Sequence, residues 1–159
     1  MEENLKLIRK FYDAFAKKDV EGMLACYGHN VAFEDPAFGP LNSEDACLMW
    51  RMLLSRGGDL KITYSNEWAD NQAGGVDWEA QYEFGIKKRK VHNKIKARFS
   101  FNQGHIISHT DSFSFWRWSS MALGLPGLLL GWSPVLRNKV RQQVLKKLKE
   151  FKALQKSSD

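Results

Sequence analysis

The sequence has little cysteine, little proline and no long apolar run. Its 159 residues include four prolines and two cysteines, Cys26 and Cys47. No Cys-x-x-Cys motif or Cys/His cluster accompanies them, which argues against a zinc site. Both cysteines are interpreted as buried, reduced side chains in helices. The longest apolar stretch, Met121–Trp132, contains three glycines and a proline and is much shorter than the roughly 20 residues of a membrane-spanning helix.

Several common signatures are also missing. The first residues, Met1–Asn4, are acidic and no apolar segment follows them, so no signal peptide is expected and the predicted location is cytoplasmic. We find no phosphate-binding glycine loop, zinc motif or serine nucleophile elbow, and the sequence therefore predicts no metal and no cofactor. The basic turn Lys87–Lys90 lacks interleaved aromatic residues, so nucleic-acid binding is not predicted.

The positive charge is concentrated near the C-terminus. The whole chain carries a formal net charge of +6. Residues 133–159 hold eight lysines and arginines against Glu150 and Asp159, which also makes +6, so residues 1–132 are neutral overall. The basicity therefore belongs to a tail and not to the main body of the chain.

Periodicity and composition predict one α+β domain. Hydrophobic residues make up 43% of the chain, enough for a single core at this length. Apolar residues at helical spacing predict helices over 5–17, 20–27, 43–56 and 136–151. Strict alternation predicts strands over 60–68, 76–84 and 91–101, with a short strand over 31–34 and a last one over 106–115. Gly28–Asn30 is expected to break the second helix, and Asn102–Gly104 to form a tight hairpin.

This order of elements is distinctive. It runs helix, short helix, a strand ending in Phe33-Glu34-Asp35-Pro36, helix, then four strands closed around Phe101–Ile106. From about Asn4 to Phe115 it resembles the nuclear transport factor two-like superfamily, which includes ketosteroid isomerases, SnoaL-like polyketide cyclases and limonene epoxide hydrolases. The resemblance implies a domain over 1–115 with a cone-shaped, curved antiparallel sheet, wrapped by N-terminal helices around a small-molecule pocket. It also implies a homodimer.

The resemblance further implies a candidate catalytic base. In ketosteroid isomerase an aspartate works with a tyrosine and a protonated aspartic acid that stabilise an oxyanion, and Asp35 occupies the position of the base. The tyrosine falls at Phe11, or at Tyr12 after a shift of one residue, and the acid falls at Ala97. Phe and Ala cannot donate hydrogen bonds, so isomerase chemistry in its usual form is not expected. Alternatively, Asp35 with Pro36 simply forms a turn.

Two polar residues on the last strand are further candidates. His109 and Asp111 are two residues apart, so they share one face of the strand. If Ala97 and Phe99 point inward, both are expected inside the sheet beside Phe113, where unpaired polar groups are costly. They either assist Asp35 in catalysis or form a satisfied structural pair. The predicted pocket-lining residues, which could equally be plain core, are Phe11, Tyr12, Phe15, Trp50, Trp78, Tyr82, Ala97, Phe99 and Phe113.

The segment 116–159 is predicted to be an apolar segment plus a basic amphipathic C-terminal helix, packed on the same domain and similar to an extension of uncharacterised bacterial relatives. An apolar segment beside a basic helix is typical of a peripheral membrane contact; otherwise Met121–Trp132 closes the pocket or is buried in a dimer. Three functions stay open: a proton-transfer enzyme with a small apolar ligand, a non-catalytic ligand-binding module, and a membrane- or partner-docking protein.

Overall fold

The computed structural model describes residues 1–158 as one α+β fold. The helices are α1 (Glu2–Ala16), α2 (Val20–Leu24), α3 (Ser43–Ser55), α4 (Phe115–Leu123), α5 (Leu125–Leu130) and α6 (Pro134–Lys156). The strands are β1 (Tyr27–Asp35), β2 (Gly39–Leu41), β3 (Lys61–Ala69), β4 (Ala73–Phe84), β5 (Arg89–Asn102) and β6 (His105–Ser112). The predicted fold class is confirmed.

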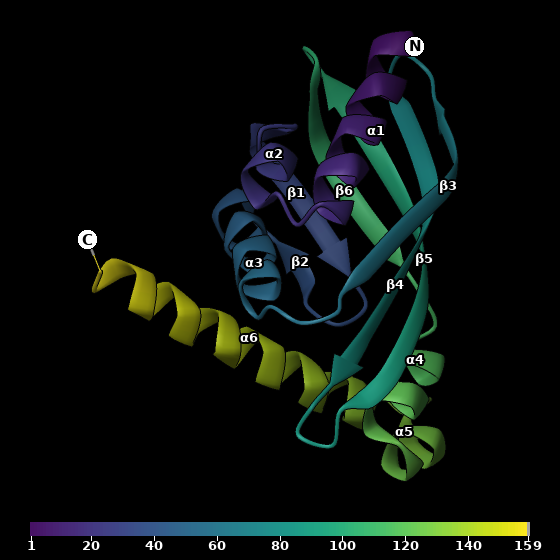
Figure 1. Cartoon of the computed structure of the whole chain (residues 1–159), viewed down its shortest axis with the longest axis vertical. Coiled ribbons are helices and arrows are strands. Elements are labelled where there is room, and N and C mark those ends of the chain that lie inside the picture. The colour runs from purple at the N-terminus through teal and green to yellow at the C-terminus, as the bar shows by residue number, and fades with distance from the viewer. Residues whose placement is uncertain (159) are drawn as a thin grey trace.

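The strands form one curved, open sheet in the order β2-β1-β6-β5-β4-β3. Neighbouring strands are antiparallel, except that β1 pairs with β6 in parallel. The sheet is therefore mixed, and its one parallel pair joins a strand from the N-terminal part to the last strand. Figure 1 shows α1, α2 and α3 packed on the concave side of the sheet, with α6 crossing below α3.

Side-chain caps begin two of the helices, α2 and α3. Asp19 Oδ1 accepts a hydrogen bond from the Gly22 N–H at 2.9 Å, and Asn42 Oδ1 accepts one from the Asp45 N–H at 2.9 Å. Such caps satisfy backbone donors that have no partner within the helix. At the Asn102–Gly104 hairpin, Gln103 and Gly104 both have positive φ, 49° and 76°, as a tight two-residue turn requires.

Several boundaries differ from the prediction. Helix α2 ends at Leu24, and Gly28–Asn30 belongs to β1, where it lies in an irregular stretch between two parts of β1 that pair with β6. The last strand ends at Ser112, since Ser114 caps α4 by accepting a hydrogen bond from the Arg117 N–H at 3.2 Å. The short strand β2 was not predicted.

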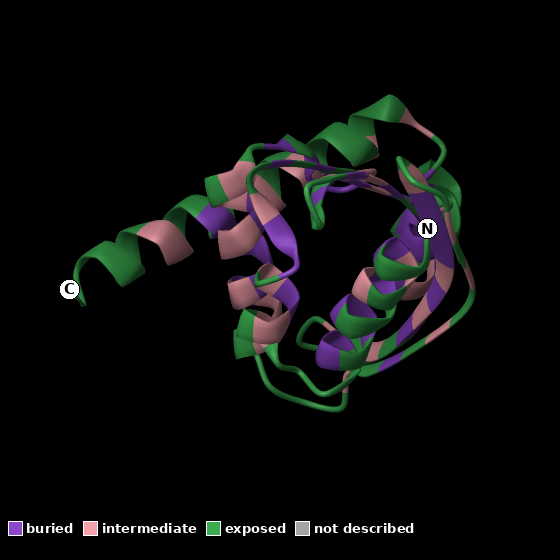
Figure 2. Ribbon diagram, turned by 90° about the horizontal axis from the view of Figure 1, so that it is seen from above, coloured by how far each residue is buried: buried purple, intermediate pink, exposed green. Residues whose placement is uncertain are grey.

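The interior consists of two adjoining clusters of apolar side chains. The larger lies between the concave face and α1–α3, and Figure 2 shows that the buried face of α1 is turned toward the strands. The smaller joins β5, α4 and α6 through Val91, Phe115, Trp118, Ala122 and Val140. Leu148 of α6 is buried in the larger cluster, so α6 contributes to both. No helix within residues 1–158 is long and apolar enough to cross a bilayer.

The packing of α6 can be tested with one pair of leucines. Leu148 is buried and Leu154, on the same helix, is 66% exposed. We expect Leu148→Ala to lower the free energy of unfolding by about 2–4 kcal/mol and Leu154→Ala by less than about 0.5 kcal/mol. Urea unfolding measures both, and trypsin should cleave α6 earlier in the Leu148 variant. Equal effects of the two substitutions would show that α6 does not pack as described.

Candidate functional site

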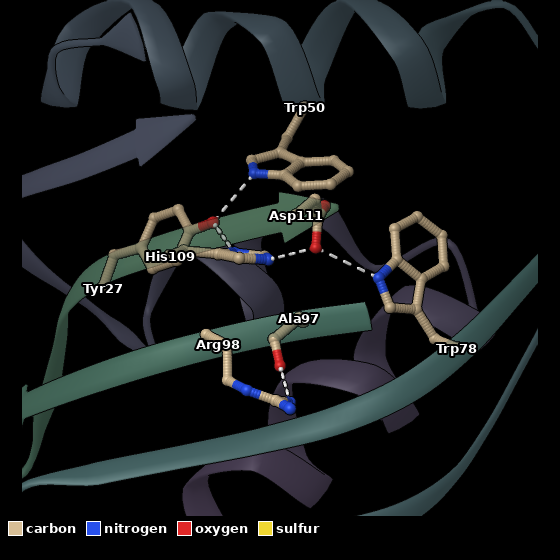
Figure 3. Close-up of polar contacts among 7 residues, drawn as sticks. All are labelled: Tyr27, Trp50, Trp78, Ala97, Arg98, His109 and Asp111. Carbon is tan, nitrogen blue, oxygen red and sulfur yellow. Dashed lines mark hydrogen bonds and ion pairs between the residues drawn. The ribbon is translucent and has the colours of Figure 1, made fainter. Parts of the chain in front are cut away.

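A chain of hydrogen bonds crosses the aromatic interior and includes both predicted residues of the last strand. The Trp50 indole N–H donates to the Tyr27 hydroxyl at 3.0 Å, and that hydroxyl lies 2.7 Å from His109 Nδ1. His109 Nε2 lies 3.0 Å from Asp111 Oδ1, which also accepts from the Trp78 indole N–H at 3.2 Å. Figure 3 shows these five side chains converging from α3, β1, β6 and β4.

One arrangement of hydrogens matches every donor with an acceptor. The Tyr27 oxygen accepts from Trp50, so its own O–H is free to donate to His109 Nδ1. The other ring nitrogen then carries the hydrogen and donates to Asp111. Burial raises the pKa of the Tyr27 hydroxyl well above its usual value, which keeps this group neutral and able to donate.

Aromatic rings enclose the histidine. His109 is fully buried. Its ring centroid lies 4.6 Å from that of Phe99, 5.1 Å from Phe33 and 5.5 Å from Phe11, and the indole of Trp50 stacks on it at 6.1 Å. Because water is excluded here, each hydrogen bond of the chain is stronger than it would be at the surface, and each unmatched group would be costly.

The strand register places the carboxyl group of Asp111 beside Ala97. Ala97 pairs with Asp111, and Phe99 pairs with His109, so all four lie on the inner face, as the strand parity predicts. Side chains directly opposite each other in a ladder are about 5 Å apart at Cβ. Asp111 therefore presents its carboxyl beside Ala97, the position to which the ketosteroid isomerase resemblance assigns the oxyanion acid.

Tyr12 carries an unmatched hydroxyl in this interior. The side chain is fully buried, and within residues 1–158 its oxygen is the one buried side-chain N or O atom without a hydrogen-bond partner. Burial raises the pKa of this hydroxyl well above its usual value, and the nearby Asp111 and Tyr27 raise it further. Tyr12 therefore holds a neutral O–H group near Asp111 whose hydrogen bond is not used within residues 1–158.

Asp35 lies at the end of β1 and is partly buried. Its Oδ1 accepts hydrogen bonds from the backbone N–H groups of Ala37 at 2.9 Å and Phe38 at 2.6 Å, so the predicted turn forms. Among the described residues, Oδ2 has no hydrogen-bond partner and is not a fully buried atom. The carboxyl is not used to cap α3, because Asn42 does that. One oxygen of Asp35 is therefore free to meet a ligand.

A second aspartate turn shows how strongly burial acts on Asp35. The exposed Asp70 also accepts two backbone hydrogen bonds, from Gln72 and Ala73, and these hold its pKa below the usual value. In Asp35 the loss of water outweighs the same type of bond, and with the nearby Asp111 it raises the pKa from 3.8 to about 7. Asp35 therefore changes its protonation state near neutral pH.

The C-terminal helix contributes a charge beside this aspartate. Arg141 of α6 donates from Nη2 to the Pro36 carbonyl at 3.3 Å and from Nε to the Ala37 carbonyl at 3.4 Å. It thereby lies on the turn that follows Asp35, and its charge lowers the pKa of that carboxyl, although less than burial raises it. Sequence reasoning placed Arg141 in a basic C-terminal helix, without assigning it to a site, and Tyr27 in a helix. No local signal in the sequence indicates that either reaches this site.

The predicted pocket-lining residues differ in how deeply they are buried. Phe11, Tyr12, Phe15, Trp50, Trp78, Ala97 and Phe99 are buried in the larger cluster, whereas Tyr82 and Phe113 are partly buried at its edge. A surface hollow of about 950 Å³ is lined by other residues, from the β4–β5 hairpin, α4 and α5. The expectation that Asp35 and Asp111 open into the largest cavity stays a prediction. A ligand pocket lined by the predicted residues stays a prediction.

Within residues 1–158, no three His, Cys, Asp or Glu side chains come together in a group that could hold a metal ion.

Comparison with known proteins places the fold. A family model described as SnoaL-like domain matches residues 8–109. An LEH-like epoxide hydrolase of M. tuberculosis has a TM-score of 0.65 and 18% identity, covering 81% of this chain and 96% of its own. A proposed polyketide cyclase from Xanthomonas campestris has a TM-score of 0.61 and 16% identity, and the match covers 76% of this chain and 96% of the cyclase. A proposed ketosteroid isomerase from Kribbella flavida has a TM-score of 0.56 and 18% identity, and the match covers 70% of this chain and 78% of the isomerase. No curated protein matches the sequence significantly.

Two tyrosines offer a test of the hydrogen-bond chain. Tyr27→Phe leaves the Trp50 N–H and His109 Nδ1 without a partner, and we expect the free energy of unfolding to fall by about 1–3 kcal/mol. Tyr12→Phe removes a hydroxyl that has no partner, so stability should be unchanged or higher. Chemical denaturation compares the two. A loss in the Tyr12 variant as large as that in the Tyr27 variant would contradict the described bonding.

The raised pKa of Asp35 has a consequence for stability. Between pH 3.8 and about 7 the folded protein keeps a proton that the unfolded chain has released, so this group lowers stability as the pH rises through that window. Asp35→Asn cannot ionise, and its stability relative to the parent protein should grow from the lower to the upper end of the window. Denaturation at several pH values measures this.

Asp70→Asn is the matched control, because its pKa is shifted the other way. Its stability relative to the parent protein should fall as the pH rises toward 3.8 and should then stay level, because the unfolded chain has released this proton by then. A common pH dependence of the two variants would refute the buried environment of Asp35.

Proposed function

Since this chain belongs to the SnoaL-like domain family, we propose that it binds a small apolar molecule against the concave face and transfers a proton with Asp35 as the base. The single observation that carries this is the free Oδ2 of a carboxyl whose pKa is about 7. A base is most effective when its pKa lies near the working pH, because it is then ionised and still takes up a proton readily.

The substrate class follows from the surroundings. The inner face carries aromatic side chains and few charges, which favours a cyclic, apolar molecule with one polar group. The likeness to an epoxide hydrolase and to proposed isomerase and cyclase structures supports substrates of this general type. We therefore assign a ring compound that carries a carbonyl group.

The proton transfer uses two groups of this chain. Asp35 Oδ2 takes a proton from the carbon next to the carbonyl, and the electron pair of that C–H bond moves toward the carbonyl oxygen, which becomes an enolate. The unmatched Tyr12 O–H donates a hydrogen bond to this oxygen, an interaction that strengthens as negative charge develops. Asp35 then returns the proton to a carbon of the same molecule. The hydrogen bonds from His109 and Trp78 hold Asp111 in place on the same inner face.

A specific observation favours a second candidate, a non-catalytic binding module. Ala97 stands where the resemblance places an acid, and Asp111 Oδ1 is already engaged by His109 and Trp78. In this alternative the aromatic face and Tyr12 bind a carbonyl compound without turnover.

Exchange of carbon-bound hydrogen separates the two candidates. A panel of cyclic ketones and enones is incubated with the protein in D₂O, and NMR follows deuterium entering beside the carbonyl. We expect Asp35→Asn to slow exchange at least about 100-fold with little loss of binding. Tyr12→Phe should lower the turnover rate more than it weakens binding, and Asp70→Asn should match the parent protein. Binding without exchange in the parent protein would leave the binding module as the function.

A further inference from the structure

The leucines of the C-terminal segment face outward. Helix α5 packs on α4 through glycines: a Cβ on Gly127 would come within 1.9 Å of the Ser119 carbonyl oxygen, and one on Gly131 within 2.2 Å of Ser119 Oγ. Only glycine allows so close an approach. The large side chains of α5 and of the neighbouring residues therefore lie outside the contact between α4 and α5.

The result is an exposed apolar patch. We use this name for Trp116, Leu125, Leu128, Leu129, Leu130, Trp132 and Val135, which are between 50% and 77% exposed. The two indoles are fixed on the patch, because the Trp116 N–H donates to the Leu128 carbonyl and the Trp132 N–H to the Leu129 carbonyl, both at 2.9 Å. Seven large apolar side chains grouped in this way on a protein surface mark an interaction site.

A basic hollow adjoins the patch. It is the hollow of about 950 Å³ between the β4–β5 hairpin and α4–α5, and its cations are Lys87, Arg89, Lys90 and Arg117. Among residues 1–158, no acidic residue lines it. Trp116 and Leu128 line the hollow and belong to the patch as well, so the cationic and the apolar surfaces are continuous. Figure 1 shows the hairpin and α5 at the same end of the molecule.

We infer that this end of the molecule binds the surface of an anionic lipid bilayer. The basic hollow takes the phosphate of a lipid headgroup, while the leucines and tryptophans enter the boundary between headgroups and acyl chains. Tryptophan is favoured at that depth, and cations beside an inserted apolar surface are the combination that binds anionic membranes. The helices lie on the bilayer and do not cross it.

Charge decides between the bilayer and a second copy of the chain. A symmetric dimer through the patch would bring two identical surfaces together and place two basic hollows near each other, each lined by four cations and, among residues 1–158, by no acidic residue. An anionic headgroup neutralises the same four charges. The bilayer therefore satisfies both the apolar and the cationic surface, and a dimer satisfies only the first.

Vesicle sedimentation tests the inference with the full chain. We expect the protein to sediment with vesicles of phosphatidylcholine and phosphatidylglycerol at low salt, much less with phosphatidylcholine alone, and more weakly as salt is raised, because salt screens the attraction. Leu129→Ser/Trp132→Ser should weaken partitioning at least about tenfold. Ile107→Ser, which changes an exposed apolar side chain outside the patch, should leave it unchanged.

The contribution of the hollow is tested at constant net charge. Lys87→Gln/Lys90→Gln should weaken partitioning on the order of tenfold, and Lys146→Gln/Lys147→Gln, which removes the same charge from exposed positions of α6, should have a much smaller effect. Three results would overturn the inference: no sedimentation at low salt, equal losses for the two lysine pairs, or a dimer in analytical ultracentrifugation that Leu129→Ser/Trp132→Ser dissociates. Binding of free glycerol phosphate without vesicle binding would likewise refute it.

Discussion

A histidine and an aspartate can be buried among aromatic rings only if every donor and acceptor between them is matched. Here the match is made by side chains from four elements: Trp50 from α3, Tyr27 from β1, Trp78 from β4, and the pair His109 and Asp111 from β6. Moving any of these strands by one residue would turn its side chain to the other face. The network therefore constrains the sheet register and the position of α3 at once.

Two polar groups differ from this network because their hydrogen bonds are not all made within residues 1–158. The Tyr12 hydroxyl has no partner, and Asp35 has one engaged and one free oxygen. Both feel the charge of Asp111, which raises the pKa of each group. A protein interior rarely leaves polar groups unmatched without a functional reason. Their proximity to the same carboxyl is the physical basis for placing a ligand's polar atom between them.

The C-terminal segment makes direct contacts with the rest of the domain. Trp118 of α4 donates to the Tyr82 hydroxyl at 2.8 Å, and Asp35 contributes to the raised pKa of that tyrosine. Arg141 of α6 lies on the turn after Asp35. The C-terminal segment, which carries the apolar patch, therefore contacts the surroundings of the candidate base directly.

The sequence by itself determined those features that depend on local periodicity. Alternation over residues 91–101 and helical spacing over 5–17 predicted β5 and α1 because burial on one face leaves a repeating pattern in the chain. Asp35 was proposed as a base from the family resemblance that Phe33–Pro36 helps to carry, and the shared face of His109 and Asp111 followed from strand parity. The second helix ends before Gly28–Asn30, as predicted, but the early start of β1 at Tyr27 was not predicted, since β1 forms by pairing with the remote strand β6.

Only the tertiary structure decided which groups meet. That Tyr27 bonds to His109, that Arg141 reaches the turn at Pro36, and that the Tyr12 hydroxyl is left without a partner all depend on distances between segments remote in sequence. The outward orientation of the α5 leucines likewise depends on how closely Gly127 approaches Ser119. A sequence pattern records which face of an element avoids water, but it does not record what that face packs against.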